Sequence, residues 1–364
     1  MHSLSPEHLA SLRFGAQSAA TLRALGEHMG RQQLYEQQAP EALKKLRQIA
    51  IVESTHSSTR LEGVVVSAAR VRSLVLHSTT PQNRSEQEVA GYRDALALIH
   101  ESAAHMPLTV GVIKQLHHML YRYMPQEGGQ FKSADNDIVE RLPDGSQRLR
   151  FHPVAAHLTP MAMEDLTRRY QTAADQHLAD SIILVPLAIL DFLCIHPFPD
   201  GNGRVSRLLT TLLLEQCGYS AVRYISLERI FEDSKESYYA ALHASSQGWH
   251  QAQHDVHPWL DYFLGALLRA YKEFEERASG VAWRGKGGKQ AHVREYVLAQ
   301  VAPFSISDVE RARPGVSRDT IRLVLRDMKA EGLIAPVGKG RGAKWVVCRP
   351  SAPMKNPPTL MGIY

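Results

Sequence analysis

One loop of the chain, HPFPDGNGRVSR at residues 196–207, carries the side chains best suited to catalysis. His196 titrates near neutral pH, so it could take a proton from a hydroxyl nucleophile. Asp200 supplies the hard oxygen atoms that a phosphate-bound Mg²⁺ requires. Arg204 and Arg207 lie three residues apart on the helix that begins here, so both guanidiniums can reach one di- or triphosphate. The loop therefore predicts a site with a base, a metal ligand and two phosphate clamps.

The same loop predicts an anion cradle. Gly201 and Gly203 flank Asn202 and let a ligand approach the backbone N–H groups without interference from a Cβ atom. The first amides of a helix are unpaired and lie at its positive dipole end, which favours phosphate. A glycine-rich turn between two core helices is the plainer alternative. That alternative gives His196, Asp200 and the two arginines no common function, whereas a single phosphate site gives a role to each of them.

Two helices must position this loop. A mostly apolar run covers residues 182–195 before the loop, and a second covers residues 208–217 after it. Apolar runs of this length are typical of buried helices. The sequence therefore predicts two core helices, with the loop opening the second of them.

The loop resembles the signature of the Fic (Fido) family, HPFx[D/E]GNGRxxR, at every fixed position. The resemblance covers about residues 40–275 and implies a mainly α fold. It implies transfer of AMP from ATP to a Ser, Thr or Tyr hydroxyl of a protein target, or of the chain itself, with release of pyrophosphate. His196 would be the base, Mg²⁺ the cofactor held by Asp200, and the ATP phosphates would contact Asp200, Gly201, Asn202, Gly203, Arg204 and Arg207. Nothing in the loop fixes the nucleobase, so transfer of another nucleotide, of phosphate or of phosphocholine, and removal of AMP, stay open.

A polar stretch at residues 53–63 predicts a second functional element. Five of its residues are Ser or Thr, which compete with the helix backbone, and such a local mismatch favours a functional site. Ser58 and Glu62 share a helix face, and Gly63 suits the position just past a helix end. The stretch resembles the inhibitory motif [S/T]xxxE[G/N] of the family, in its second, N-terminal regulatory class. The resemblance implies that Glu62 pairs with Arg207 and blocks the seat of the γ-phosphate. A solvated helix end is the alternative.

A β-hairpin is predicted at residues 137–151. Two extended pieces, 137–142 and 147–151, flank an Asp-Gly turn, which is a strong hairpin signal. The preceding residues 128–132 resemble the G-x-[FY]-[RK] element that comes before the target-binding flap of the family. The free edge of such a hairpin could take a target segment as an added strand near His196. A surface hairpin without a binding role is the alternative.

Other residues receive less specific interpretations. Tyr238 and Tyr239 resemble the nucleobase wall of the family, where an aromatic face would stack on adenine, but core packing explains both rings nearly as well. The spacing of Ser85 and Glu88 predicts a capping box at the start of a helix. A zinc site is not expected, because no finger-like ligand spacing accompanies the remaining histidines. Of these histidines, His117 and His118 are expected to be structural, while His250, His254 and His257 are accompanied only by Asp255.

The composition is that of a soluble globular protein, with 364 residues of which 44% are hydrophobic and 22% charged. The sequence contains no apolar run of ~18 residues, so we expect no membrane span. The first residues lack the pattern of a signal peptide. Three cysteines, an odd number, predict a reduced protein without a disulfide framework. We therefore expect a cytoplasmic protein with no membrane partner.

The C-terminal part has a charge of its own. Residues 281–364 hold 15 Lys and Arg against 6 Asp and Glu, a net charge of +9, whereas the whole chain carries +5. Three helical segments followed by two extended pieces resemble a winged helix-turn-helix domain. Its recognition helix would present Arg318, Arg322 and Arg326, and its wing would present Lys339, Arg341 and Lys344. Such domains bind DNA or serve as docking and dimerisation modules, so a DNA partner and a homo-oligomer both stay open.

The predicted fold is mainly α, with a Fic helical core, a β-hairpin flap and a C-terminal winged helix-turn-helix domain. Its parts are an N-terminal helical region with the inhibitory helix (1–84), the Fic catalytic core (85–279), a linker (280–289), the winged helix-turn-helix domain (290–349) and a disordered tail (350–364). The leading functional prediction is a protein adenylyltransferase inhibited by Glu62. The main alternative from another class is a DNA-binding regulator whose Fic core senses nucleotide.

Overall fold

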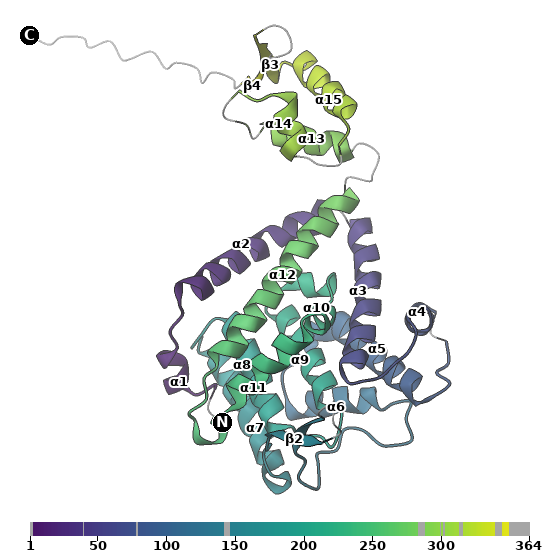
Figure 1. Cartoon of the computed structure of the whole chain (residues 1–364), viewed down its shortest axis with the longest axis vertical. Coiled ribbons are helices and arrows are strands. Elements are labelled where there is room, and N and C mark those ends of the chain that lie inside the picture. Colours follow the sequence, from purple (N-terminus) through teal and green to yellow (C-terminus); the bar gives the residue numbers. More distant parts are fainter. Residues whose placement is uncertain are drawn as a thin grey trace, which may run out of the picture. The chain divides into compact units, whose positions relative to one another are not determined.

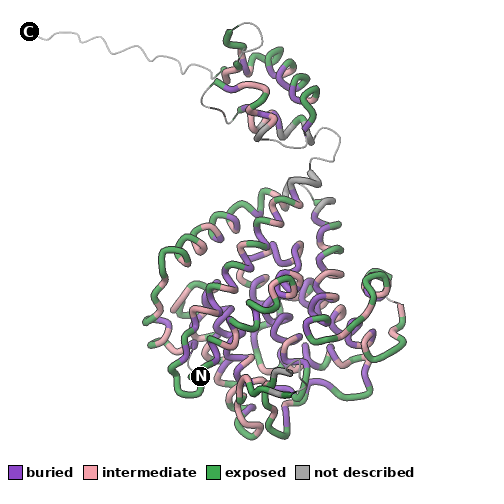
Figure 2. The backbone as a smooth tube through the Cα atoms, viewed as in Figure 1, coloured by how far each residue is buried: buried purple, intermediate pink, exposed green. Residues whose placement is uncertain are grey.

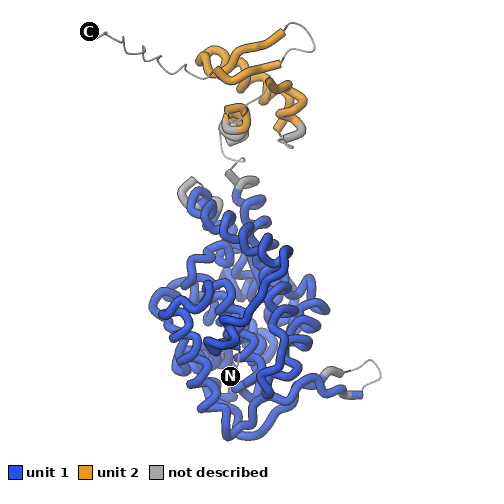
Figure 3. The backbone as a smooth tube through the Cα atoms, turned by 90° about the vertical axis from the view of Figure 1, so that its left-hand side faces the viewer, with its two compact units in different colours: residues 1–278 blue, residues 279–364 orange. Residues whose placement is uncertain are grey.

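The chain folds into helices and two small antiparallel hairpins, as the sequence predicts (Figure 1). The computed structural model describes residues 3–38, 40–77, 79–141, 146–282, 288–298, 300, 303–312, 316–338 and 344–348. Two compact units, Met1–Ala278 and Ser279–Tyr364, make up the chain (Figure 3). Within the described ranges, no helix combines the length and the apolar character that a bilayer span needs.

The first unit holds most of the helices and the hairpin that the sequence predicts near residue 140. Its elements are α1 (Pro6–Ser11), α2 (Ala16–Gln38), α3 (Pro40–Leu61), α4 (Ala68–Leu76), α5 (Arg84–Ser102), η1 (Ala103–His105), α6 (Val110–Leu120), β1 (Ile138–Arg141), β2 (Gln147–Phe151), η2 (Ala156–Leu158), α7 (Thr159–Asp175), α8 (Ser181–Ile195), α9 (Asn202–Gln216), η3 (Ser220–Arg223), α10 (Leu227–Asp233), α11 (Lys235–Ser246), η4 (Trp249–Gln251) and α12 (His257–Ala282).

Helices α8 and α9 form the centre of this unit and correspond to the two predicted core helices. Nearly every residue of α8 is buried, and so is α9 from Arg204 to Leu214 (Figure 2). The carboxylate of Asp180 accepts a hydrogen bond of 2.9 Å from the N–H of Ile182 and so caps the start of α8. The loop of residues 196–201 joins the two helices, and its backbone is therefore anchored at both ends by packed core.

The hairpin β1–β2 pairs Val139 with Leu149 and Ile138 with Phe151, with a register shift between Ile138 and Val139. The two strands confirm the predicted extended pieces. The Asp-Gly turn itself, within residues 142–145, lies outside the described residues.

The second unit contains α13 (Gly288–Leu298), α14 (Ile306–Ala312), α15 (Arg318–Ala330), β3 (Ile334–Val337) and β4 (Lys344–Val347). It has its own apolar core, in which Val293, Val309 and Ile321 take part. The order of three helices and a β-ribbon is the predicted one. Helix α12 extends to Ala282 and α13 begins at Gly288, so both helix ends enter the predicted linker. Lys339 and Arg341 of the expected wing, and the expected tail, lie outside the described residues.

Candidate active site

His196 ends α8 in a left-handed backbone conformation, with φ of 50° and ψ of 61°. This region is uncommon for a residue with a side chain and is found preferentially at functional sites. The Nδ1 atom lies 3.3 Å from the carbonyl oxygen of Leu193, which can only accept a hydrogen bond, so Nδ1 carries the proton and Nε2 the lone pair. Burial lowers the pKa of His196 to about 4. The imidazole is therefore neutral near pH 7, as a proton acceptor must be.

Asn202 fixes the shape of the loop with its side chain. Its Oδ1 accepts a hydrogen bond of 2.9 Å from the N–H of Phe198, and its Nδ2 donates one of 2.7 Å to the carbonyl oxygen of the same residue. Gly201, with φ of 82°, stands at the N-cap of α9, where no side chain caps the first amides. A ligand that binds here would thus meet backbone N–H groups, while the Asn202 side chain is occupied with the loop.

Asp200 presents a carboxylate that is 60% exposed at the mouth of the loop. Its Oδ1 accepts from the N–H of Gly201 at 2.7 Å, and its Oδ2 accepts from the Tyr121 hydroxyl at 3.1 Å. Partial burial raises the pKa of Asp200. The charge of Arg204 and these two hydrogen bonds lower the pKa by more than burial raises it, so the net shift is downward. The group is ionised and accessible. Among the described residues, no group of three or more His, Cys, Asp and Glu side chains is placed to hold a metal ion.

Arg204 is 2% exposed and joins two carboxylates. Its Nη1 donates to Oε2 of Glu88 at 2.5 Å, and its Nη2 donates to Oδ2 of Asp200 at 3.3 Å. Its Nε is buried and, in the described structure, meets no hydrogen-bond acceptor. No motif in the sequence assigns Glu88 to the site. The predicted capping box was wrong, because Asn83 is the N-cap of α5 and its side chain accepts from the N–H of Glu86.

Arg207 is also 2% exposed, and the end of α3 holds it. Its Nε donates to the Ser58 hydroxyl at 2.8 Å, and its Nη2 donates to the Ser58 carbonyl oxygen at 2.9 Å and to Oε1 of Glu62 at 2.7 Å. The structure thus brings together Ser58, Glu62 and Arg207, as the sequence motifs predict.

The helix end that places Glu62 is a Schellman motif. The N–H of Val64 donates to the carbonyl oxygen of Thr59 at 3.1 Å, and the N–H of Gly63 donates to that of Arg60 at 2.9 Å. Gly63 takes the required positive φ, 83°. The position of Gly63 past the helix end agrees with the prediction, and it leaves Glu62 as the last residue before the turn.

The carboxylate of Glu62 occupies the space against Gly203, in the first turn of α9. A Cβ atom on Gly203 would collide with Oε1 of Glu62 and lie 3.1 Å from its Cδ. The negative charge therefore sits at the positive end of α9, where the sequence predicts phosphate. Gly203 is required here for close approach, since any side chain would displace the carboxylate.

The Ser and Thr residues before Glu62 face the interior of the unit. Ser54, Thr55, Ser57, Ser58 and Thr59 are all buried. Ser54 donates to Oε2 of the buried Glu228 at 2.7 Å, and the hydroxyl of Tyr92 donates to its Oε1 at 2.8 Å. The polar stretch is therefore buried against the interior and not a solvated helix end, and within the described structure the Thr55 hydroxyl meets no hydrogen-bond partner.

A segment at residues 128–136, here called the loop brace, fixes the loop of residues 196–201 from the other side. The Lys132 N–H donates to the Pro197 carbonyl oxygen at 2.9 Å, and the Lys132 Nζ donates to that of Ile195 at 3.2 Å. Asn136 donates to the carbonyl oxygen of Phe198 at 3.1 Å. These bonds tie residues on both sides of His196 to one segment, so the loop brace sets where its imidazole lies.

His117 connects the loop brace to Asp200. The N–H of Gly129 donates to its Nδ1 at 2.7 Å, and its Nε2 donates to the carbonyl oxygen of Asp200 at 3.0 Å. Its ring stacks on Phe198 at a centroid distance of 3.8 Å. Both nitrogens are used in the neutral form, which agrees with the expected structural role. Only the three-dimensional structure reveals that this role serves the loop of residues 196–201.

The two tyrosines of the predicted nucleobase wall have different surroundings. Tyr238 is buried and stacks on Phe231 at 5.1 Å, so its ring belongs to an aromatic core cluster. Tyr239 is exposed, and its hydroxyl donates to the carbonyl oxygen of Leu61 at 3.3 Å, at the end of the helix that carries Glu62. A stacking role stays a prediction for both rings, and the exposed ring of Tyr239 is better placed for it.

Part of the chain is similar in sequence to proteins of a known family. The model of the Fic/DOC family matches residues 107–214, which include the whole loop from His196 to Arg207. The chain is 25% identical over 233 residues to the protein adenylyltransferase Fic of Drosophila willistoni, covering 62% of this chain and 42% of the relative. It is 25% identical over 274 residues to that of Drosophila virilis, covering 73% and 51%. The chain thus spans about half the length of these curated relatives.

Solved structures share the fold. A Fic family protein from Desulfovibrio desulfuricans G20 is similar with a TM-score of 0.60 at 20% identity, covering 94% of this chain and 98% of that one. Fic-1 from C. elegans (residues 134–508) is similar with a TM-score of 0.58 at 19% identity, covering 72% of each chain. At these identities the likeness establishes the fold, while the match to the Fic/DOC domain rests on the sequence. Residues 107–214 therefore match the Fic/DOC family, and the chain shares the fold of these Fic proteins.

Proposed function

We propose that this protein transfers AMP from ATP to a Ser, Thr or Tyr hydroxyl of a protein target, and of itself, and that Glu62 holds it inactive. One observation carries the proposal: a neutral imidazole with an available Nε2 lone pair, that of His196, stands at the entrance to a helix N-terminus occupied by an anion, the carboxylate of Glu62. The name protein adenylyltransferase, which the curated relatives carry, supports the same reaction.

The reaction needs little covalent chemistry from the protein. The target hydroxyl oxygen forms a bond to the α-phosphorus of ATP, and the bond from that phosphorus to the bridging oxygen breaks, releasing pyrophosphate. The hydroxyl proton passes to Nε2 of His196. The first amides of α9 and the guanidiniums of Arg204 and Arg207 would stabilise the charge that grows on the leaving pyrophosphate. Most of the rate enhancement then comes from positioning.

The residues present fit a magnesium ion that arrives with ATP. Mg²⁺ is commonly held by one or two carboxylates together with substrate phosphates and water. Asp200 offers an ionised carboxylate with 60% of its side chain exposed, and it lies beside the start of α9. When bound there, Mg²⁺ would neutralise charge on the phosphates.

The contacts of Glu62 support inhibition by two routes. The hydrogen bond from Nη2 of Arg207 withdraws that cation from the γ-phosphate. The carboxylate also fills the space against Gly203 at the positive end of α9. A triphosphate would thus meet an occupied anion site and an occupied clamp, which would leave its α-phosphorus misplaced.

The test is incubation with ATP labelled at the α-phosphate and Mg²⁺, using a cell lysate as the target source. We expect weak labelling by the wild type, strong labelling by Glu62→Gly, and none by Glu62→Gly/His196→Ala, which should still bind ATP. Labelling by the double variant within tenfold of Glu62→Gly would remove His196 from the role of base. Parallel reactions with other labelled nucleotides, and with AMP-modified targets, separate AMP transfer from the sister reactions.

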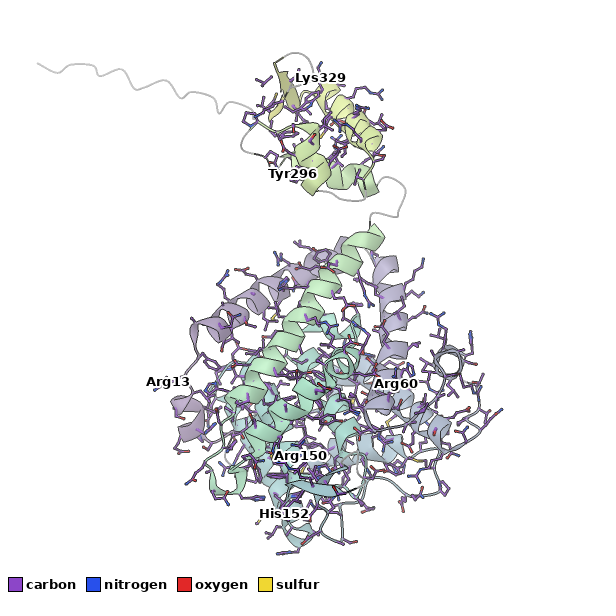
Figure 4. The ribbon with its side chains drawn as sticks, viewed as in Figure 1. Arg13, Arg60, Arg150, His152, Tyr296 and Lys329 are labelled. Atoms are coloured by element: carbon purple, nitrogen blue, oxygen red, sulfur yellow. The ribbon has the colours of Figure 1, made fainter. Side chains whose placement is uncertain are left out.

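A second candidate function, DNA binding through α15, is favoured by one exposed stripe of cations. Arg318, Arg322, Arg326 and Lys329 follow one exposed face of α15 (Figure 4 labels Lys329). Among the residues that the structure describes, each of the three arginines pairs with one acid, Arg318 with Glu310 at 3.0 Å, and such pairs at the surface are weak enough to be exchanged for phosphates. Full-length protein should then bind duplex DNA with an affinity that falls steeply with salt. Unchanged affinity in Arg318→Gln/Arg322→Gln/Arg326→Gln would reject this function.

A further inference from the structure

The carboxylate of Asp200 is held by hydrogen-bond donors from three directions. Its Oδ1 accepts from the N–H of Gly201 at 2.7 Å. Its Oδ2 accepts from Nη2 of Arg204 at 3.3 Å and from the hydroxyl of Tyr121 at 3.1 Å. Gly201 is the next residue in the chain, and Arg204 lies one helical turn further on. Tyr121 stands at the end of α6, 79 residues earlier, so it can orient the carboxylate from outside the loop of residues 196–201.

The ring of Tyr121 is fixed by packing that does not involve the Asp200 carboxylate. Helix α6 packs against α5 and α9, and the ring lies 4.7 Å from that of the buried His117. Two glycines let the chain approach Tyr121 closely. A Cβ atom on Gly128 would lie 2.8 Å from the Cβ of Tyr121, and one on Gly201 would lie 3.4 Å from its Cε2. The hydroxyl is therefore a donor with a set position, beside a carboxylate whose side chain is 60% exposed.

Arg204 holds the same carboxylate oxygen less firmly. Its Nη1 donates to Oε2 of Glu88 at 2.5 Å, whereas its Nη2 is 3.3 Å from Oδ2 of Asp200. The shorter bond commits the buried guanidinium to Glu88. Without the Tyr121 hydroxyl, the described residues would hold Asp200 only by that long bond and by the N–H of Gly201. Tyr121 therefore provides the main side-chain restraint on Oδ2.

These bonds leave the two oxygens of Asp200 in different states. Oδ2 accepts two hydrogen bonds and Oδ1 accepts one. Because each oxygen of an ionised carboxylate can accept about two hydrogen bonds, Oδ1 keeps a lone pair that Oδ2 lacks. Carboxylates that bind metal ions are themselves oriented by hydrogen-bonded neighbours, and loss of such a neighbour typically weakens metal binding by about 10- to 100-fold. The arrangement therefore favours a cation at Oδ1.

We propose that Tyr121 is a positioning residue, which holds Oδ2 of Asp200 so that Oδ1 is the oxygen offered to the divalent cation that arrives with ATP. The inference rests on the proposed function for the nucleotide and on the three hydrogen bonds for the choice of oxygen. Tyr121 acts through Asp200 and not on the reacting atoms. Loss of its hydroxyl should therefore weaken binding of the cation and leave the nucleotide contacts of α9 in place.

The test measures binding of Mn²⁺, a paramagnetic substitute for Mg²⁺, from the loss of the EPR signal of the free ion. Full-length Glu62→Gly protein is used in excess over an ATP analogue with a methylene group between the α- and β-phosphates, which cannot release pyrophosphate. We expect one Mn²⁺ site per bound analogue and its loss in Glu62→Gly/Asp200→Asn. Glu62→Gly/Tyr121→Phe should bind Mn²⁺ about tenfold more weakly. Affinity for the analogue without metal should not change.

A second readout separates positioning from a general structural defect. In the Glu62→Gly background, Tyr121→Phe should raise the Mg²⁺ concentration that gives half-maximal self-labelling by about tenfold. The rate of self-labelling should be recovered at saturating Mg²⁺, because the ring and its packing are kept. A rate that stays low at saturating Mg²⁺ would overturn the positioning role.

The matched control is Tyr123→Phe, which removes a hydroxyl that donates to Asp94 at 2.7 Å, two residues further along the chain. It should leave the Mn²⁺ affinity and the Mg²⁺ requirement unchanged. Unchanged Mn²⁺ affinity in the Tyr121→Phe variant, an equal loss in the control, or a site that survives Asp200→Asn overturns the proposal. Weaker Mn²⁺ binding in the Tyr121→Phe variant, with no AMP transfer by any variant, would refute the proposed function and leave the positioning role standing.

Discussion

Replacing Glu62 by Gly removes the carboxylate that holds Arg207 and fills the space against Gly203. Arg207 keeps two further contacts, from its Nε to the Ser58 hydroxyl and from its Nη2 to the Ser58 carbonyl oxygen, so its guanidinium stays near the site. What disappears is one charge-assisted hydrogen bond of 2.7 Å, in a pair whose partners are 28% and 2% exposed. One N–H of Nη2 is then released for the γ-phosphate, while the other keeps its bond to the Ser58 carbonyl oxygen.

The size of the effect follows from that bond. A hydrogen bond to a charged group contributes about 1.5–3 kcal/mol, and 1.4 kcal/mol corresponds to a factor of ten. If ATP must break this bond before it seats correctly, its loss raises self-labelling by about 10- to 100-fold at equal ATP. Glu62→Gln keeps the bulk against Gly203 and loses the charge, so it should give a gain of about 3- to 10-fold.

The assay is the initial rate of self-labelling by wild type, Glu62→Gly, Glu62→Gln and Arg207→Ala. Arg207→Ala should stay as slow as the wild type, because it removes the clamp together with the lock. A Glu62→Gly rate no higher than wild type would refute the inhibitory role. A Glu62→Gln rate equal to that of Glu62→Gly would show that the charge matters and the filled space does not.

Four further predictions follow from the contacts of the loop. In Glu62→Gly protein, the rate of AMP transfer should stay constant as the pH falls from 7 and be lost near pH 4, because the lowered pKa of His196, about 4, keeps the imidazole unprotonated above that value. A profile of rate against pH in which activity is lost at pH 6.5 would contradict this. Lys132→Met removes a neighbouring cation that helps lower this pKa, so the acid limb of the same profile should move to higher pH, and an unmoved limb would exclude the effect. Glu88→Gln should lower the free energy of unfolding by about 3 kcal/mol, since it leaves the buried Arg204 without its main counter-charge; urea titration measures the change, and a loss below about 1 kcal/mol would argue against it. Burial also lowers the pKa of His117 from 6.5 to about 4. Between these two pH values the unfolded state binds a proton that the folded state does not, so the free energy of unfolding should fall as the pH falls from 6.5 to about 4. His117→Gln should make this fall smaller, as urea titrations at several pH values would measure.

The parts of the site that the sequence predicts are those encoded locally. The two core helices, the loop that opens α9, the helix end at Gly63 and the hairpin strands all follow from apolar runs, glycines and spacing within a few residues. The meeting of Ser58, Glu62 and Arg207, which are far apart in sequence, was predicted from family motifs and not from local physics.

What the sequence could not predict depends on contacts between distant segments. Glu88 is 116 residues from Arg204, and His117 is 83 residues from Asp200, so no local pattern links them. A weak signal for Glu88 exists, because it lies four residues before the buried Tyr92 and thus on the apolar face of α5. The Asn202 side chain was expected near phosphate, and its two bonds to Phe198 are visible only once the loop is folded.

The length of α3 has a consequence for control of the site. Glu62 directly follows a helix of 22 residues, which spans about 33 Å at 1.5 Å per residue. A helix of this kind transmits motion as a stiff rod, so a tilt of about 2° about its far end displaces the carboxylate by about 1 Å. Glu53, in the middle of α3, is bound by Arg229 of α10 at 3.3 Å and by Arg277 of α12 at 3.5 Å (Figure 1). On the proposed function, a ligand that shifts α10 or α12 would therefore move Glu62 and change access to the site without touching a nucleotide.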